Sequence, residues 1–166
     1  MTAETLLSLP ALLDTDIFSE FLRGRNVTVA RRAAVYETVH AHFTISAVTL
    51  MEVVSGWQRR GLHARVDELL ARLVTWTVLA VDGDVATLAG RMRGDLLRTG
   101  QPTGVANPLI AATALHHNLV LVTGNTVHYQ RLQALGYDLQ LDDWRAEERE
   151  SAACRTSPSR MANSGR

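Results

Sequence analysis

Residues 107–129 read NPLIAATALHHNLVLVTGNTVHY, and this stretch decides the fold. Asn107 followed by Pro108 is typical of a helix start, because asparagine caps helices well and proline fits the first helical turn. The apolar run from Leu119 to Val122 predicts a buried strand, and Asn125 indicates the start of a second helix. A helix, a strand and a helix are therefore expected in succession.

The same alternation extends over most of the chain. Four more short apolar runs predict strands at Ala11 to Leu13, His42 to Ile45, Trp76 to Val81 and Tyr137 to Leu141. Stretches with helical spacing lie between them, and their starts are marked by Asp16, Ser46 and Asp82 or Asp84. This alternation predicts an α/β fold with a central, mainly parallel five-stranded sheet flanked by helices. Ligands bind such sheets beyond the carboxyl ends of the strands.

Arginine supplies all 17 basic residues, and these balance 17 acidic residues to a formal net charge of zero. This balance excludes a polycationic protein, so any nucleic-acid surface must be a local patch. Arginines that cluster in the first helices could form such a patch, face a partner, or be only a solvated face. They are Arg23, Arg25, Arg31, Arg32, Arg59, Arg60 and Arg65.

One domain is expected over residues 1–144, followed by a polar tail over residues 145–166 that we expect to be disordered. Cys154, in that tail, is the only cysteine, which excludes a disulfide framework or a cysteine-based zinc site within one chain. A reducing compartment is therefore expected. No stretch fits a signal peptide or a membrane span, so a cytoplasmic protein is predicted.

Two carboxylates stand where chemistry is expected. Asp14 ends the first predicted strand, although Asp14 and Asp16 could instead only cap the following helix. Glu52 lies in SAVTLMEVVSGW, where its neighbours are mostly apolar. A carboxylate drawn into a core must neutralise, pair or bind a metal, and a glutamate that faces solvent is the alternative.

Asn107 and Asn125 could each be explained as helix caps alone. Together with Asp14 and Glu52, however, they form four short polar side chains from four separated segments. Such a set can converge on one ion. Oxygen ligands without cysteine or an ordered histidine spacing favour Mg²⁺ or Mn²⁺. We therefore predict a divalent-metal site built from these four residues.

Three segments resemble the PIN-domain ribonucleases, and most of all the VapC-type toxins of bacterial toxin–antitoxin pairs. They are LLDTD at residues 12–16, TLMEVVSG at residues 49–56, and the stretch over residues 107–129. The resemblance covers roughly residues 11–144. It implies a PIN-like three-layer fold and an Mg²⁺- or Mn²⁺-dependent endoribonuclease that hydrolyses RNA phosphodiester bonds with a metal-activated water.

The same resemblance assigns roles and partners. Asp14, Glu52 and Asn125 match the family's acidic and late polar positions, so together with Asn107 they are the implied catalytic and metal-binding residues. Thr15, Asp16 and Thr123 are expected to support them. The implied partners are RNA, as tRNA or rRNA, and a VapB-type antitoxin, and the implied assembly is a homodimer.

Asn107 is the main departure from the family pattern, which has aspartate at this position. The amide keeps the shape of the side chain but deletes a negative charge beside the expected cation. We therefore predict weak metal binding and slow or absent RNA cleavage. Two histories fit: an aspartate engineered away to silence a toxic enzyme, or drift towards a binding role.

Two other functions compete with this prediction. A non-catalytic PIN-like module would bind RNA or protein and cleave nothing. A phosphate-accepting receiver domain would use an acidic pair at the first strand, which Asp14 and Asp16 supply. That class also needs a later lysine, and the chain has none, so we disfavour it.

Overall fold

A computed structural model describes residues 8–146 of the chain. Its centre is a five-stranded sheet in the order β3-β2-β1-β4-β5, with every neighbouring pair parallel. The strands are β1 (Ala11–Leu13), β2 (Thr44–Ser46), β3 (Thr77–Leu79), β4 (Val120–Val122) and β5 (Leu141–Asp142). The predicted α/β sheet is confirmed. Most of the predicted tail, residues 147–166, lies outside the described residues.

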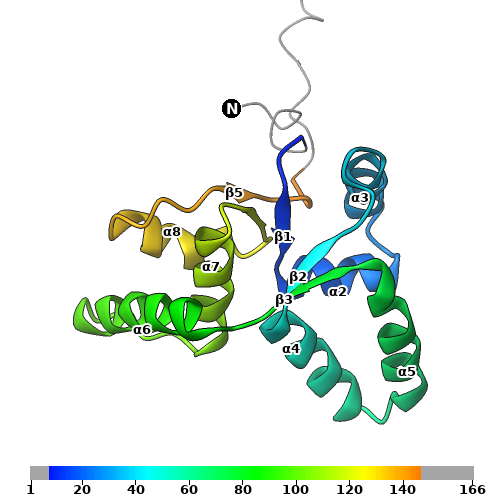
Figure 1. Cartoon of the computed structure of the whole chain (residues 1–166), viewed down its shortest axis with the longest axis horizontal. Coiled ribbons are helices and arrows are strands. Elements are labelled where there is room, and N and C mark those ends of the chain that lie inside the picture. The colour runs from blue at the N-terminus through cyan, green and yellow to red at the C-terminus, as the bar shows by residue number, and fades with distance from the viewer. Residues whose placement is uncertain (1–7, 147–166) are drawn as a thin grey trace, which may run out of the picture.

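Helices cover both faces of this sheet, which gives three layers. They are α2 (Thr15–Arg23), α3 (Val27–His40), α4 (Ala47–Gln58), α5 (His63–Arg72), α6 (Gly83–Arg98), α7 (Ala106–His116) and α8 (Thr126–Ala134), with a short 3₁₀ turn at Leu73–Thr75. Figure 1 shows α6, α7 and α8 on one side and α2, α3 and α5 on the other. Within residues 8–146, no helix is both long and apolar enough to cross a bilayer.

The central strand β1 belongs to two hydrophobic cores. Leu12 packs with the α6 and α7 core, whereas Ala11 and Leu13 pack with the α2 and α3 core. This follows from the strand geometry, because successive side chains point to opposite faces. Both leucines are fully buried, and each such burial is worth about 2 kcal/mol. The two cores therefore fix β1 rigidly, and with it the residue that follows.

Several predicted helix starts differ from the observed ones. Asp14, not Asp16, occupies the cap position of α2, and its side chain accepts a hydrogen bond from the Thr15 N–H. The prediction that Asn107 caps α7 is wrong, because the helix begins at Ala106 and Asn107 lies inside its first turn. Asn125 does precede α8, but its side chain makes no capping hydrogen bond. Both asparagine side chains are therefore left for another role.

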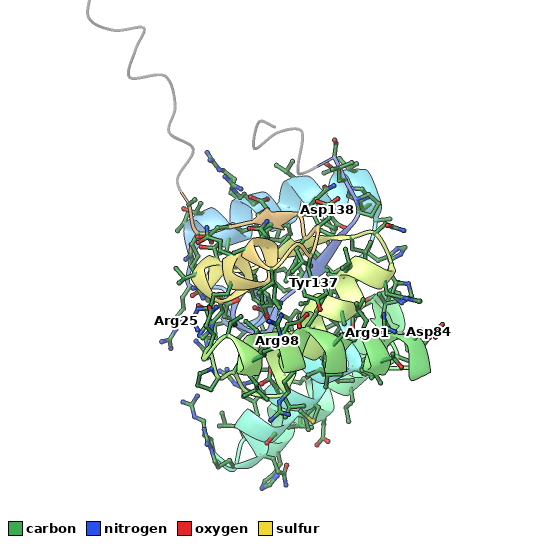
Figure 2. The ribbon with its side chains drawn as sticks, turned by 90° about the vertical axis from the view of Figure 1, so that its left-hand side faces the viewer. Arg25, Asp84, Arg91, Arg98, Tyr137 and Asp138 are labelled. Carbon is green, nitrogen blue, oxygen red and sulfur yellow. The ribbon has the colours of Figure 1, made fainter. Side chains whose placement is uncertain are left out.

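Tyr137 also departs from its predicted place in the last strand. β5 begins only at Leu141, and Tyr137 lies in the irregular segment between α8 and β5. Its hydroxyl donates a 2.9 Å hydrogen bond to Asp95 Oδ2 of α6. Asp95 is also paired with Arg98, and Figure 2 labels both Tyr137 and Arg98 on this face of the molecule. Tyr137, which suggested a strand, thus attaches the segment between α8 and β5 to α6.

Arg32 is excluded from the predicted arginine patch. Its side chain is buried in α3, where Nη1 pairs with Asp142 Oδ1 at 3.3 Å and Nη2 donates to the Ala146 carbonyl. Burial raises the pKa of Asp142, and the charge of Arg32 opposes that rise. The pair therefore attaches the last strand to α3.

We expect Arg32→Ala to lower the free energy of unfolding by about 3 kcal/mol, because it leaves the Asp142 carboxylate buried without a partner. Arg98→Ala is the matched control, since it breaks an exposed pair with Asp95 and should cost under about 1 kcal/mol. Urea unfolding followed by circular dichroism measures both. Equal losses in the two variants would contradict the structural role given to Arg32.

Candidate functional site

The register between β1 and β4 places Asp14 beside Thr123. Leu13 pairs with Val122, so the next residue of each strand lies at the carboxyl edge of the sheet. The Asp14 N–H donates to the Val122 carbonyl at 2.9 Å, and the Thr123 hydroxyl donates to Asp14 Oδ2 at 2.8 Å. The Tyr129 hydroxyl adds a 3.0 Å bond to the same oxygen. The Asp14 carboxylate is therefore held from several sides.

Asp14 is an unusual carboxylate because it is only 6% exposed. Burial, and to a lesser extent the nearby charge of Asp16, raise the pKa of Asp14 to about 6, although hydrogen bonds from Thr123, Thr15 and Tyr129 oppose the rise. Burial also raises the pKa of Tyr129, so its hydroxyl stays protonated and can donate the hydrogen bond to Asp14. Among residues 8–146, no cationic side chain pairs with the Asp14 carboxylate, so burial disfavours its ionised form.

Glu52 reaches the same place from α4. It is half-buried, as the apolar neighbours in its segment indicated. Its Oε2 accepts a 2.6 Å hydrogen bond from the Thr15 hydroxyl, while the N–H of the same threonine donates to Asp14 Oδ1 at 2.7 Å. One residue therefore positions both carboxylates.

All four residues singled out in the sequence line one cavity of about 320 Å³. Asp14 lies at its base as a buried residue, Glu52 and Asn107 are half-buried, and Asn125 is exposed. The remaining lining residues are Thr15, Asp16, Ser19, Glu20, Arg23 and Arg145. Side chains from α2, α4 and α7, from the residues just before α2 and α8, and from the segment after β5 thus meet at one edge of the sheet.

Glu20 and Arg145 were missed by the sequence analysis. Arg145 Nη2 lies 3.1 Å from Asp16 Oδ2 and 2.8 Å from Glu20 Oε1. The i, i+4 spacing of Asp16 and Glu20 was a usable signal, because it places both on one face of a helix. The sequence around Arg145 gave no such signal, because Arg145 falls in the polar segment predicted to be a tail. Only the fold brings it here.

Within residues 8–146, no group of three His, Cys, Asp or Glu side chains is arranged to hold a metal ion. Asparagine supplies two of the four predicted positions, so carboxylates alone do not complete a set. Mg²⁺ nevertheless needs only one or two protein carboxylates, and water or amide oxygens can fill its other positions. Asp14 and Glu52, with the amide oxygens of Asn107 and Asn125, are therefore the residues of this cavity that could hold a divalent cation.

The fold and this site match a known class of proteins. The model of the PIN domain matches residues 11–133, and the chain belongs to the PIN domain family. The family resemblance seen in the sequence is thereby confirmed.

Particular relatives narrow this class. The tRNA(fMet)-specific endonuclease VapC of Shigella flexneri is 29% identical over 137 residues, which cover 80% of this chain and 96% of that protein. The structure of VapBC-1 from nontypeable Haemophilus influenzae matches with a TM-score of 0.67 at 27% identity, over 83% of this chain and 100% of that chain. A toxin–antitoxin complex from Klebsiella pneumoniae matches with a TM-score of 0.55 at 26% identity, over 70% and 87%. This chain is similar to VapC-type proteins over nearly their whole length.

We expect the buried charge of Asp14 to destabilise the metal-free protein as pH rises. Between pH 3.8 and about 6 the folded chain holds a proton on Asp14 that the unfolded chain has released, so stability falls through this window. The full difference corresponds to about 3 kcal/mol. In chelator at pH 7.5, Asp14→Asn should therefore be more stable than the parent by up to that amount, and the gain should vanish near pH 4.

Urea unfolding at several pH values between 4 and 7.5 measures this difference. Asp138→Asn is the matched control, because Asp138 is exposed and its substitution removes the same charge from the surface (Figure 2). A parent protein that is more stable than Asp14→Asn at pH 7.5 in chelator would refute the expectation.

Proposed function

We propose that this chain is a divalent-metal-dependent endoribonuclease of the VapC toxin type. The observation that supports it is the convergence of Asp14, Glu52, Asn107 and Asn125 on one cavity at the carboxyl edge of a parallel sheet. The relatives named endonuclease and ribonuclease VapC support RNA as the substrate. We propose Mg²⁺ or Mn²⁺ as the cofactor and a tRNA or rRNA as the target.

The side chains divide the work between them. Asp14 would hold the cation, because its carboxylate is fixed by donors from Thr15, Thr123 and Tyr129 and so needs little reorganisation to bind. Glu52, positioned by the Thr15 hydroxyl, would bind the cation directly or through water and orient the attacking water. The bound cation supplies polarisation of the phosphate and a more acidic water.

Asn107 and Asn125 would complete the site with amide oxygens. Neither side chain makes a capping hydrogen bond, and both line the cavity. An amide at position 107 contributes no negative charge, however. A pair of unit charges 4 Å apart is worth on the order of 4 kcal/mol at an effective dielectric constant near 20, before hydration offsets part of it. We therefore propose a site that binds its cation weakly and cleaves slowly.

The proposed partners are inferred from the proteins that this chain is similar to. Similar chains occur in solved toxin–antitoxin complexes, so we propose a VapB-type antitoxin as the protein partner. We also propose a homodimer as the assembly, as the family resemblance implies. A cytoplasmic location fits an enzyme that acts on tRNA or rRNA. Among the candidate arginines, Arg23 lines the cavity, so we propose it for a phosphate contact.

We expect Asn107→Asp to cleave RNA at least about tenfold faster than the parent chain, because it restores a negative charge beside the cation. The assay incubates both proteins with mixed tRNA and rRNA in Mg²⁺, in Mn²⁺ and in chelator, and resolves products by gel. Asn118→Asp is the matched control, since it makes the same chemical change beyond the far end of α7. Adding Asp14→Asn to the restored variant should abolish cleavage.

The second candidate function is a non-catalytic PIN-like module that binds RNA or a protein partner. Asn107, which removes the charge that the family pattern supplies, is the observation in its favour. The same assay separates the two. Absence of cleavage by Asn107→Asp in either metal, with RNA still bound in a gel-shift experiment, would favour the binding module and overturn the nuclease proposal.

A further inference from the structure

The cavity has a positively charged residue that its predicted chemistry does not use. Four carboxylates line it, from Asp14, Asp16, Glu20 and Glu52, together with two guanidinium groups, from Arg23 and Arg145. Among residues 8–146, only the second of these groups is seen in an ion pair with lining carboxylates. Arg145 comes from the segment after the last strand, far in sequence from the residues that it contacts.

Arg145 is bound tightly for a residue near the end of the described chain. A single guanidinium nitrogen, Nη2, contacts both Asp16 and Glu20, and only 34% of the side chain is exposed. Its Nε is buried and has no hydrogen-bond partner in the described part of the chain. An unsatisfied buried donor is costly, so the two ion pairs must hold the side chain there against that cost.

Gly124 makes room for this arrangement. A Cβ at Gly124 would collide with the Arg145 guanidinium, whose atoms are the nearest to it. The backbone of Gly124 does not require glycine, because its φ is not in the left-handed region. Its N–H donates to the same Asp16 oxygen that Arg145 contacts. Absence of a side chain at position 124 thus lets the guanidinium lie against the strand end.

We propose that Arg145 is a built-in cation of this cavity, which occupies Asp16 and Glu20 and thereby weakens the binding of a divalent cation at Asp14 and Glu52. The inference rests on the cation site of the proposed function and adds a positioning residue to it. Two effects act together. The positive charge of Arg145 repels a second cation in the cavity, and its ion pairs withhold two carboxylates that could otherwise turn towards that cation.

A Mn²⁺ titration of the full chain tests this inference, with free Mn²⁺ counted by electron paramagnetic resonance. Arg145→Ala should bind Mn²⁺ about tenfold more tightly than the parent, as loss of a nearby positive charge implies. Gly124→Ala should act in the same direction although it keeps the arginine, because its Cβ displaces the guanidinium. The double variant should bind Mn²⁺ no more tightly than Arg145→Ala alone. Thermal melting confirms that each variant is folded.

Arg98→Ala is the matched control, because it removes the same charge from an exposed pair with Asp95 that does not line the cavity. Its Mn²⁺ affinity should equal that of the parent. The inference is overturned if Arg145→Ala binds Mn²⁺ within threefold of the parent affinity, or more weakly. If the parent binds Mn²⁺ and Arg145→Ala does so equally, only this inference fails. If neither binds, the proposed cation site fails as well.

Discussion

The pairing of β1 with β4 is the constraint on which the site depends. Their register sets Leu13 opposite Val122, so Asp14 and Thr123 must leave the sheet side by side. The two hydrophobic cores fix that register, because a slip of one residue would turn Leu12 and Leu13 to the wrong faces. A carboxylate is thereby forced into a place where only 6% of the residue is exposed. Apolar packing in the sheet thus determines the electrostatics at its edge.

As a result, the two pairs of carboxylates in the cavity have different electrostatic surroundings. On one side, Thr15 connects Asp14 and Glu52, and no cationic side chain pairs with either carboxylate in the described residues. On the other side, Asp16 and Glu20 share Arg145. Within residues 8–146 the first pair therefore has no cationic partner, whereas Arg145 balances part of the negative charge of the second pair. This division separates a position for a metal from the rest of the cavity.

Local sequence patterns predicted much of this arrangement. Short apolar runs located all five strands. Polar residues at predicted helix starts located Asp14, Asn107 and Asn125, although Asn107 follows α6 and a loop and not a strand. Boundaries were less predictable. Tyr137 has the character of a strand residue but lies in an irregular segment and donates to Asp95. Asn107 has the character of a cap but lies one residue inside its helix. In both cases a tertiary contact or the course of the preceding loop outweighed local preference.

The sequence by itself determined the parallel α/β fold and the four polar residues of the cavity, because hydrophobic period and capping residues are local properties. Tertiary structure alone decided the environment of those residues. It buried Asp14 beneath Tyr129, buried Arg32 against Asp142, and brought Arg145 over Gly124 to Asp16 and Glu20. The bond of Asp14 to Tyr129 and the ion pairs of Arg32 and Arg145 join residues 110 to 129 positions apart. The energy of a charge depends on what surrounds it in space, and one-dimensional spacing does not contain that information.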